Sequence, residues 1–160
     1  MRVLLRRWAV GVSLLALSAT PSVANACSDL SKQSFAVRSL QTELMVAALT
    51  CQIRAEYNSF VSQFKNNLVR NGTALRNFYE VRFGADGEKH LNAYVTKLAN
   101  KASQRTIKAR ADYCVQAKQL FSEVLASEPG LLATIAADRP LTINNMPSMC
   151  SDAIDVATVE

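Results

Sequence analysis

Apolar residues recur at spacings of three and four over two long stretches of the chain, residues 32–71 and 88–126, and neither stretch contains glycine or proline. This spacing places the apolar side chains on one face of an α-helix. The first stretch predicts one long helix or two nearly collinear ones, with Ser31 or Ser34 as the N-cap and Asn71-Gly72 as the stop signal. The second stretch predicts another long helix, from Glu88 to Ala126.

Shorter elements are expected between and after these two helices. Thr73 to Phe83 predicts a short helix, and Gly84-Ala85-Asp86-Gly87 predicts a turn. Pro129 favours the first turn of a last short helix, and Arg139-Pro140 ends the regular structure. No strand pattern or internal repeat is evident. The predicted fold class is therefore all-α: a disulfide-stapled helical bundle built on two long antiparallel helices, with a short connecting helix and a C-terminal short helix plus tail.

The first 26 residues have the pattern of a signal peptide. Basic Arg6-Arg7 precede the apolar run Trp8 to Leu17, and Ala24-Asn25-Ala26 has the small-x-small pattern that signal peptidase recognises. Cleavage is expected between Ala26 and Cys27. The run is shorter than the roughly 20 apolar residues that span a bilayer, so no transmembrane segment is predicted. The sequence predicts a periplasmic or secreted protein.

Removal of that peptide defines the expected domains and their charge. Residues 27–138 form the helical bundle, and residues 139–160 form an acidic C-terminal tail tethered by Cys150. The part after residue 26 is nearly neutral, with 15 basic and 13 acidic residues, but residues 54–118 hold 12 Lys/Arg against 5 Asp/Glu. Residues 119–160 hold Arg139 alone against 6 acidic residues. A basic body therefore carries an acidic tail.

The four cysteines, Cys27, Cys51, Cys114 and Cys150, predict two disulfides in an oxidising compartment. In one continuous helix Cys27 and Cys51 lie too far apart to bond. In an antiparallel hairpin the numbers of facing residues have a constant sum, and pairing Cys51 with Cys114 places the turn near the short connecting helix. This favours Cys51–Cys114 with Cys27–Cys150, and Cys27–Cys114 with Cys51–Cys150 remains the alternative. The spacings match no metal or C-x-x-C redox pattern, so no metal or other cofactor is predicted.

Two groups of residues are candidates for binding. One is a basic stripe on a single face of the second long helix, a candidate for contact with an anionic surface or with the acidic tail, although a solvated face explains it more simply. The other is an aromatic group near the connecting end of the hairpin, which could line a groove for a lipid or a partner's helix but is more simply explained as core. The stripe consists of Lys97, Lys101, Arg105 and Lys108, and the aromatic group of Tyr57, Phe60, Phe64, Phe78 and Tyr94, with Tyr79 and Phe83 beside them.

No common catalytic motif is found in the sequence. His90 is the single histidine, and it has no cysteine nucleophile or second ligand at a matching spacing, which favours a structural role. An enzyme would have to use His90 or scattered carboxylates such as Glu56, Glu80 and Asp112. The sequence therefore favours an exported, non-enzymatic binding or scaffold protein whose partner is a protein or an envelope component. A carrier of an apolar or anionic small molecule is the alternative, nucleic acid is not an expected partner, and the oligomeric state is undecided.

Overall fold

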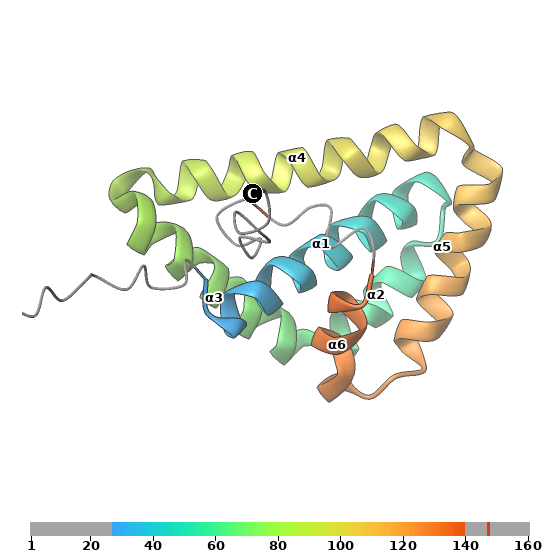
Figure 1. The fold of residues 1–160 in the computed structure, drawn as a ribbon. Helices are drawn as coiled ribbons and strands as arrows, with labels where there is room; N and C mark the ends of the chain where they lie inside the picture. Colours follow the sequence, from blue (N-terminus) through green and yellow to red (C-terminus); the bar gives the residue numbers. More distant parts are fainter. Residues whose placement is uncertain (1–26, 140–146, 148–160) are drawn as a thin grey trace, which may run out of the picture.

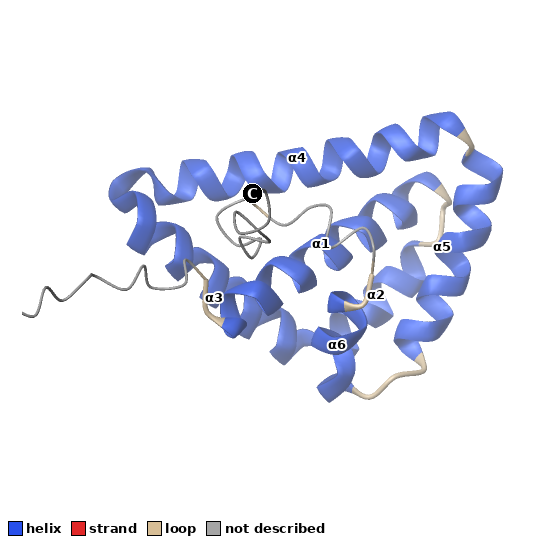
Figure 2. Ribbon diagram, viewed as in Figure 1, coloured by secondary structure: helices blue, strands red, loops and turns tan. Residues whose placement is uncertain are grey.

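The computed structural model describes residues 27–139 and Pro147. The all-α, disulfide-stapled fold class is confirmed, since these residues form helices joined by short loops and contain no strand (Figure 2). Two short 3-10 turns, Gly84–Asp86 and Pro129–Leu131, precede α4 and α6. The α-helices are α1 (Asp29–Thr50), α2 (Arg54–Gln63), α3 (Lys65–Phe83), α4 (Gly87–Lys108), α5 (Arg110–Leu125) and α6 (Leu132–Ala137).

Helix α1 runs through the middle of the molecule, and every other α-helix contacts it (Figure 1). Twelve of its 22 residues are buried, on more than one side of the helix. A helix that is apolar nearly all round belongs in the interior. Its buried polar side chains are bonded: the Ser34 hydroxyl donates to the Leu30 carbonyl at 2.7 Å and lies 3.3 Å from Oδ1 of Asn71.

The prediction of one long helix, or of two nearly collinear ones, over residues 32–71 is wrong, because the chain bends between α1 and α2. The backbone N–H of Ile53 donates to the Ala48 carbonyl at 3.0 Å, and that of Cys51 to the Ala47 carbonyl at 2.8 Å. Gln52 has φ = 61°, the left-handed conformation of a Schellman C-cap. Ile53 and Ala48 belong to the same buried cluster, which supplies the apolar contact of this motif. The helix therefore ends without the glycine that usually marks such a stop.

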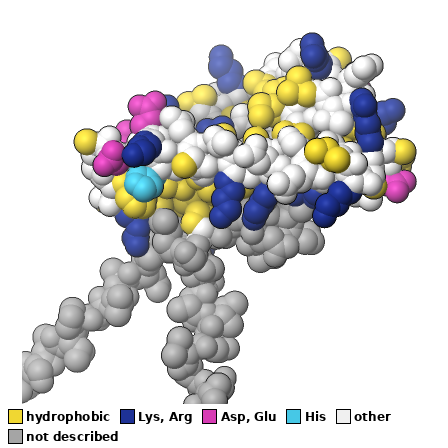
Figure 3. Space-filling view, turned by 90° about the horizontal axis from the view of Figure 1, so that it is seen from above, with side chains coloured by type: hydrophobic (Ala, Val, Ile, Leu, Met, Phe, Trp, Pro, Cys, Tyr) yellow, Lys and Arg dark blue, Asp and Glu magenta, His cyan; other side chains and the backbone are white. Residues whose placement is uncertain are grey.

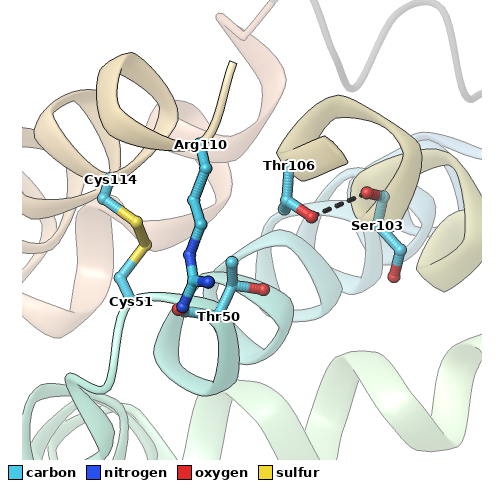
Figure 4. The surroundings of a disulfide bond; sticks show 6 residues. All are labelled: Thr50, Cys51, Ser103, Thr106, Arg110 and Cys114. Atoms are coloured by element: carbon cyan, nitrogen blue, oxygen red, sulfur yellow. Dashed lines mark hydrogen bonds between the residues drawn. A yellow bond between two sulfur atoms is a disulfide. The ribbon is translucent and has the colours of Figure 1, made fainter. Parts of the chain in front are cut away.

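The second predicted long helix is also broken, at Ala109, whose backbone dihedrals are φ = −155° and ψ = 69°. Directly after this break, Nη2 of Arg110 donates to the Thr50 carbonyl at 2.8 Å (Figure 4). That carbonyl is one of the last four of α1, which lack partners within their own helix, and a cation is favourable at a helix C-terminus. The bend between α4 and α5 is thus bonded directly to the end of α1.

Two other predicted boundaries are wrong. Asn71-Gly72 lies inside α3 and does not end it; Asn71 is buried, and its Nδ2 donates to the Asn67 carbonyl at 2.8 Å. Ser28, not Ser31 or Ser34, is the N-cap of α1, because its hydroxyl accepts the backbone N–H of Ser31 at 3.2 Å. The turn at 84–87 and the short helix after Pro129 are confirmed, with 3-10 geometry at the start of each.

Long helices do lie antiparallel, but the pair is α3 and α4. Phe83 stacks on His90 and Tyr79 contacts Tyr94, and the numbers in both pairs have the same sum. Close approach of the two helices depends on Gly87, because a Cβ there would lie 2.9 Å from backbone atoms of Tyr79 and Glu80.

Helices α1 and α4 instead run in the same direction (Figure 1), and contacts between them and their continuations keep a nearly constant difference in number. The difference is 62 for Glu43 and Arg105, 63 for Cys51 and Cys114, and 62 for Gln63 and Leu125. The α1–α2 segment therefore lies alongside the α4–α5 segment, and both bend at the same place. The helices that follow the two bends begin with similar residues, which are Arg54-Ala55-Glu56-Tyr57 in α2 and Arg110-Ala111-Asp112-Tyr113 in α5.

Two buried clusters form the core. The larger one joins α1, α2, α5 and α6 and includes Phe60, Phe64 and Phe121. The smaller one lies between α1, α3 and α4 around Phe35, whose ring makes edge contacts with Phe78, Tyr79 and Tyr94. Helix α1 contributes to both clusters and so connects them.

Candidate functional site

The structure confirms the predicted bond between Cys51 and Cys114 and rejects the alternative pairing (Figure 4). The two Cα atoms lie 5.5 Å apart, and a surface hollow beside the bond is bordered by Thr50 and Arg110. Cys150, and with it the predicted Cys27–Cys150 bond, lies outside the described residues, as do the signal peptide at 1–26 and nearly all of the tail. These remain predictions.

The basic stripe on α4 does not present four equivalent charges. Arg105 turns toward α1, where its Nη2 forms an ion pair with Glu43, whose side chain is 11% exposed. Lys97 and Lys108 are exposed, whereas Lys101 is half-buried. The view onto α4 shows basic side chains spaced along one edge with uncharged side chains between them (Figure 3). The basic side chains on this face are separated by uncharged ones and do not form one continuous basic patch.

The aromatic group is divided between the two clusters. Phe60 and Phe64 are fully buried in the larger cluster, with Tyr57 packed at its border, while Phe78 and Tyr94 surround Phe35 in the smaller one. They do not form a common groove. Burial raises the pKa of the Tyr94 hydroxyl, with the neighbouring Tyr79 adding to the shift and Arg38 opposing it.

The candidate catalytic residues lie on different helices. His90 is exposed in the first turn of α4, and its ring stacks on Phe83 with ring centres 3.9 Å apart. Glu80 and Asp112 are exposed on α3 and α5, and Glu56 is half-buried on α2. In residues 27–139, no three or more His, Cys, Asp or Glu side chains are grouped in a way that could hold a metal ion.

An apolar groove that the sequence analysis did not predict lies between the start of α1 and one face of α3. It has a volume of about 770 Å³, within the range of ligand-binding clefts. Val81 is 89% exposed and Leu30 46% exposed, and Phe78 of the smaller cluster forms part of the lining. Exposed apolar side chains that share one hollow are typical of an interaction site, whereas the same residues scattered singly are ordinary. We call this hollow the α1–α3 groove.

The charged residues of the α1–α3 groove are both basic. Arg70 and Arg82 line it, and none of the other described residues in its lining carries a carboxylate. The two arginines are 12 residues apart on α3, which corresponds to about 18 Å along a helix. Both are exposed. The α1–α3 groove therefore presents an apolar strip with a positive charge toward each end.

The sequence contains a pattern that indicates one side of this groove, provided that α3 is continuous through Gly72. Arg70, Ala74, Asn77 and Val81 follow helical spacing and share one face of α3. That face exists only if the helix continues through Gly72, where the sequence predicts a stop. Leu30 could not have been placed beside it without knowing that α1 packs on α3.

Comparison with protein-family models, curated proteins and solved structures gave no match for this chain. Among the residues that the structure describes, no helix is sufficiently long and apolar to cross a membrane.

Proposed function

We propose that this chain is an exported, non-enzymatic binding protein, and that the α1–α3 groove binds an amphipathic helix of a partner protein with an apolar stripe bordered by carboxylates. The observation that supports this most directly is Val81, which is 89% exposed within an apolar hollow. The larger side chains Leu30 and Phe78 lie in the same hollow. Covering these side chains would remove apolar surface from water, which stabilises a complex by about 25 cal/mol per Å².

The openness of the groove favours a helix over a small molecule. Binding sites for small molecules usually enclose most of the ligand surface. A small molecule seated against Val81 would remain in contact with water, because the side chain itself is so exposed. An amphipathic helix instead binds an open groove through residues spaced by three, four and seven.

The two arginines of the groove indicate which residues we expect beside the apolar stripe of the partner's helix. Arg70 and Arg82 would each meet a carboxylate at the border of the partner's apolar stripe, about three helical turns apart. Such charges at the edge of an interface mainly set the rate of association and the choice of partner. The fit therefore requires an acidic helix and disfavours a basic one.

The test begins with a photo-crosslinking residue at Leu30 or Val81, and at Ile107 as the control, in the native host. Ile107 on α4 is 83% exposed and lies outside the α1–α3 groove. The proposal expects the same partner peptide at Leu30 and Val81, none of it at Ile107, and an apolar stripe flanked by acids in its sequence. A crosslinked peptide without that pattern, or a lipid in place of a peptide, would contradict the proposal.

A synthetic copy of the captured peptide then gives the affinity. Val81→Asp should weaken binding at least tenfold, because it places a carboxylate in the apolar strip, whereas Ile107→Asp should leave it unchanged. Arg70→Glu with Arg82→Glu should weaken binding and remove most of its dependence on salt. Equal affinity for all these variants would show that the peptide binds elsewhere.

A further inference from the structure

The α1–α3 groove lies close to the residue to which the C-terminal tail is predicted to be bonded. Cys27 is buried in the smaller cluster and comes three residues before Leu30, which lines the groove. Three residues span at most about 11 Å. The predicted partner of Cys27 is Cys150, the cysteine that remains in this chain beside the bonded pair. This bond would hold the first of residues 151–160 near the groove, and a segment of that length can reach about 33 Å.

Residues 151–160 have the chemistry that we propose for an occupant of this groove. Their sequence is Ser-Asp-Ala-Ile-Asp-Val-Ala-Thr-Val-Glu, which contains three acidic residues, five apolar residues and no basic residue. Asp155 and Glu160 are five residues apart and enclose three of the apolar residues. An extended chain covers about 17 Å over five residues, close to the distance of about 18 Å between Arg70 and Arg82 along α3. An apolar run with a carboxylate at each end therefore matches an apolar strip with a cation toward each end.

The basic stripe on α4 is the other surface that the acidic tail could contact, and it matches the segment less well. Arg105 of the stripe is already paired with Glu43, and uncharged side chains separate the basic ones (Figure 3). In the groove, neither Arg70 nor Arg82 forms an ion pair with another residue of the described part of the chain. Val81 adds exposed apolar surface there. The groove therefore offers a partner to both the acidic and the apolar residues of the segment.

We propose that residues 151–160 occupy the α1–α3 groove while no partner is bound, with Asp155 and Glu160 beside its two arginines and the apolar residues between them on its apolar strip. The inference rests on the proposed function, because it makes that groove a regulated site from which the partner's helix has to displace the segment. A tethered segment has a high effective concentration, so weak contacts are sufficient to cover the groove. A segment that covers the groove in about nine molecules of ten lowers the affinity for the partner about tenfold.

The direct test is a photo-crosslinking residue at Val81 in purified protein expressed from the full chain, with its disulfides formed and no partner added. Mass spectrometry should find the crosslink within one chain, to a peptide from residues 151–160. The same residue placed at Ile107, which is 83% exposed on α4, is the control and should not reach that peptide. A crosslink from Val81 that never includes the segment, or that always joins two chains, would overturn the proposal.

Charge reversal tests the assigned contacts in the same assay. Asp155→Lys with Glu160→Lys should remove most of the crosslink, because it places like charges together. Adding Arg70→Glu and Arg82→Glu to that variant should restore the crosslink, because the charges are again opposite. Asp152→Lys is the matched control, since it changes one charge of the same segment outside the assigned pair and should have a much smaller effect. Equal crosslinking in all these variants would contradict the proposal.

A chain that ends at Cys150 separates this inference from the proposed function. It keeps all four cysteines and lacks the segment. It should bind the synthetic copy of the captured peptide about tenfold more tightly than the full chain does. Equal affinity of the two chains, with the partner still captured at Val81, would overturn this inference and leave the proposed function standing. A crosslink to the segment in a protein that captures no partner in its host would support this occupant and contradict the proposed function.

Discussion

Cys51 and Cys114 are bonded at the two points where parallel segments of the chain change direction. Cys51 follows the last residue of α1, Cys114 lies in the first turns of α5, and their Cα atoms are 5.5 Å apart. Arg110 adds a hydrogen bond from the same bend of α5 to the Thr50 carbonyl. The disulfide therefore fixes the register of two bent segments, rather than clamping the middles of two straight helices.

The first prediction is that removing this disulfide destabilises the fold without abolishing its helical content. The combined change Cys51→Ser and Cys114→Ser should lower the free energy of unfolding by about 2–4 kcal/mol, because the bond closes a long loop in the unfolded chain. Urea denaturation followed by circular dichroism measures the difference. Arg110→Ala is the control, since it removes the neighbouring hydrogen bond and keeps the disulfide. We expect it to cost about 0.5–1.5 kcal/mol, and a disulfide-free variant as stable as this control would contradict the prediction.

The second prediction concerns two glycines that respond in opposite ways to alanine. Gly87→Ala should destabilise the protein, because its Cβ would lie 2.9 Å from backbone atoms of Glu80 that cannot move without separating α3 from α4. Gly72→Ala should raise the free energy of unfolding by about 0.5–1 kcal/mol, because this position is inside a helix and has nothing within 4 Å of the added atom. Thermal and urea unfolding measure both changes. A destabilising Gly72→Ala would mean that α3 does not continue through this residue.

The sequence predicted the helical class and the Cys51–Cys114 bond, but the register used for the bond was wrong. The prediction assumed antiparallel facing of two straight helices, whereas α1 and α4 are parallel. The bond forms because both segments bend at the same place. Local signals failed at these bends: Gln52 adopts a conformation usually given to glycine, and Ala109 interrupts a stretch without a helix breaker. Packing of Ile53 and the bond from Arg110 decide these two positions, and both depend on contacts distant in sequence.

The candidate site was less predictable than the fold. Of the aromatic residues that were candidates for binding, Phe60, Phe64 and Tyr94 are buried in the core, whereas Phe78 also lines the α1–α3 groove. Their division into two clusters follows from the central position of α1, which contributes Phe35 to one cluster and Leu44 to the other. Asn71 explains the missed face of α3. Its side chain is buried and bonded to the Asn67 carbonyl, so it supports the helix that it was expected to end.

The third prediction is a loss of stability at alkaline pH. Burial raises the pKa of Tyr79 to about 12, from an ordinary value near 10. At a pH between these two pKa values, Tyr79 has lost its proton in the unfolded chain and retains it in the folded chain. Stability from this group is therefore fully present below about pH 10 and decreases as the pH rises toward 12. Urea denaturation from pH 9 to 11.5 should show this decrease, and Tyr79→Phe should make the slope shallower; an unchanged slope would contradict it. Tyr94 and Tyr113, whose pKa values are also raised, keep part of the slope in the variant.

The fourth prediction tests export. Intact-mass measurement of the protein from its native host should give a chain that begins at Cys27, because Ala24-Asn25-Ala26 fits signal peptidase. Ala26→Pro should block cleavage and leave the longer chain. Recovery of an uncleaved wild-type chain from the cytoplasm would contradict the prediction and, with it, the proposed location.

The central position of α1 has a consequence for the order in which the molecule assembles. Synthesis proceeds from the N-terminus, so the helix on which all others pack is made first and has to wait for them. Leu132 and Ala136 of α6, both fully buried against it, are among the last described residues to be made. Nascent chains that end before residue 132 therefore expose apolar surface of α1, and during biogenesis this helix is the natural target for a chaperone.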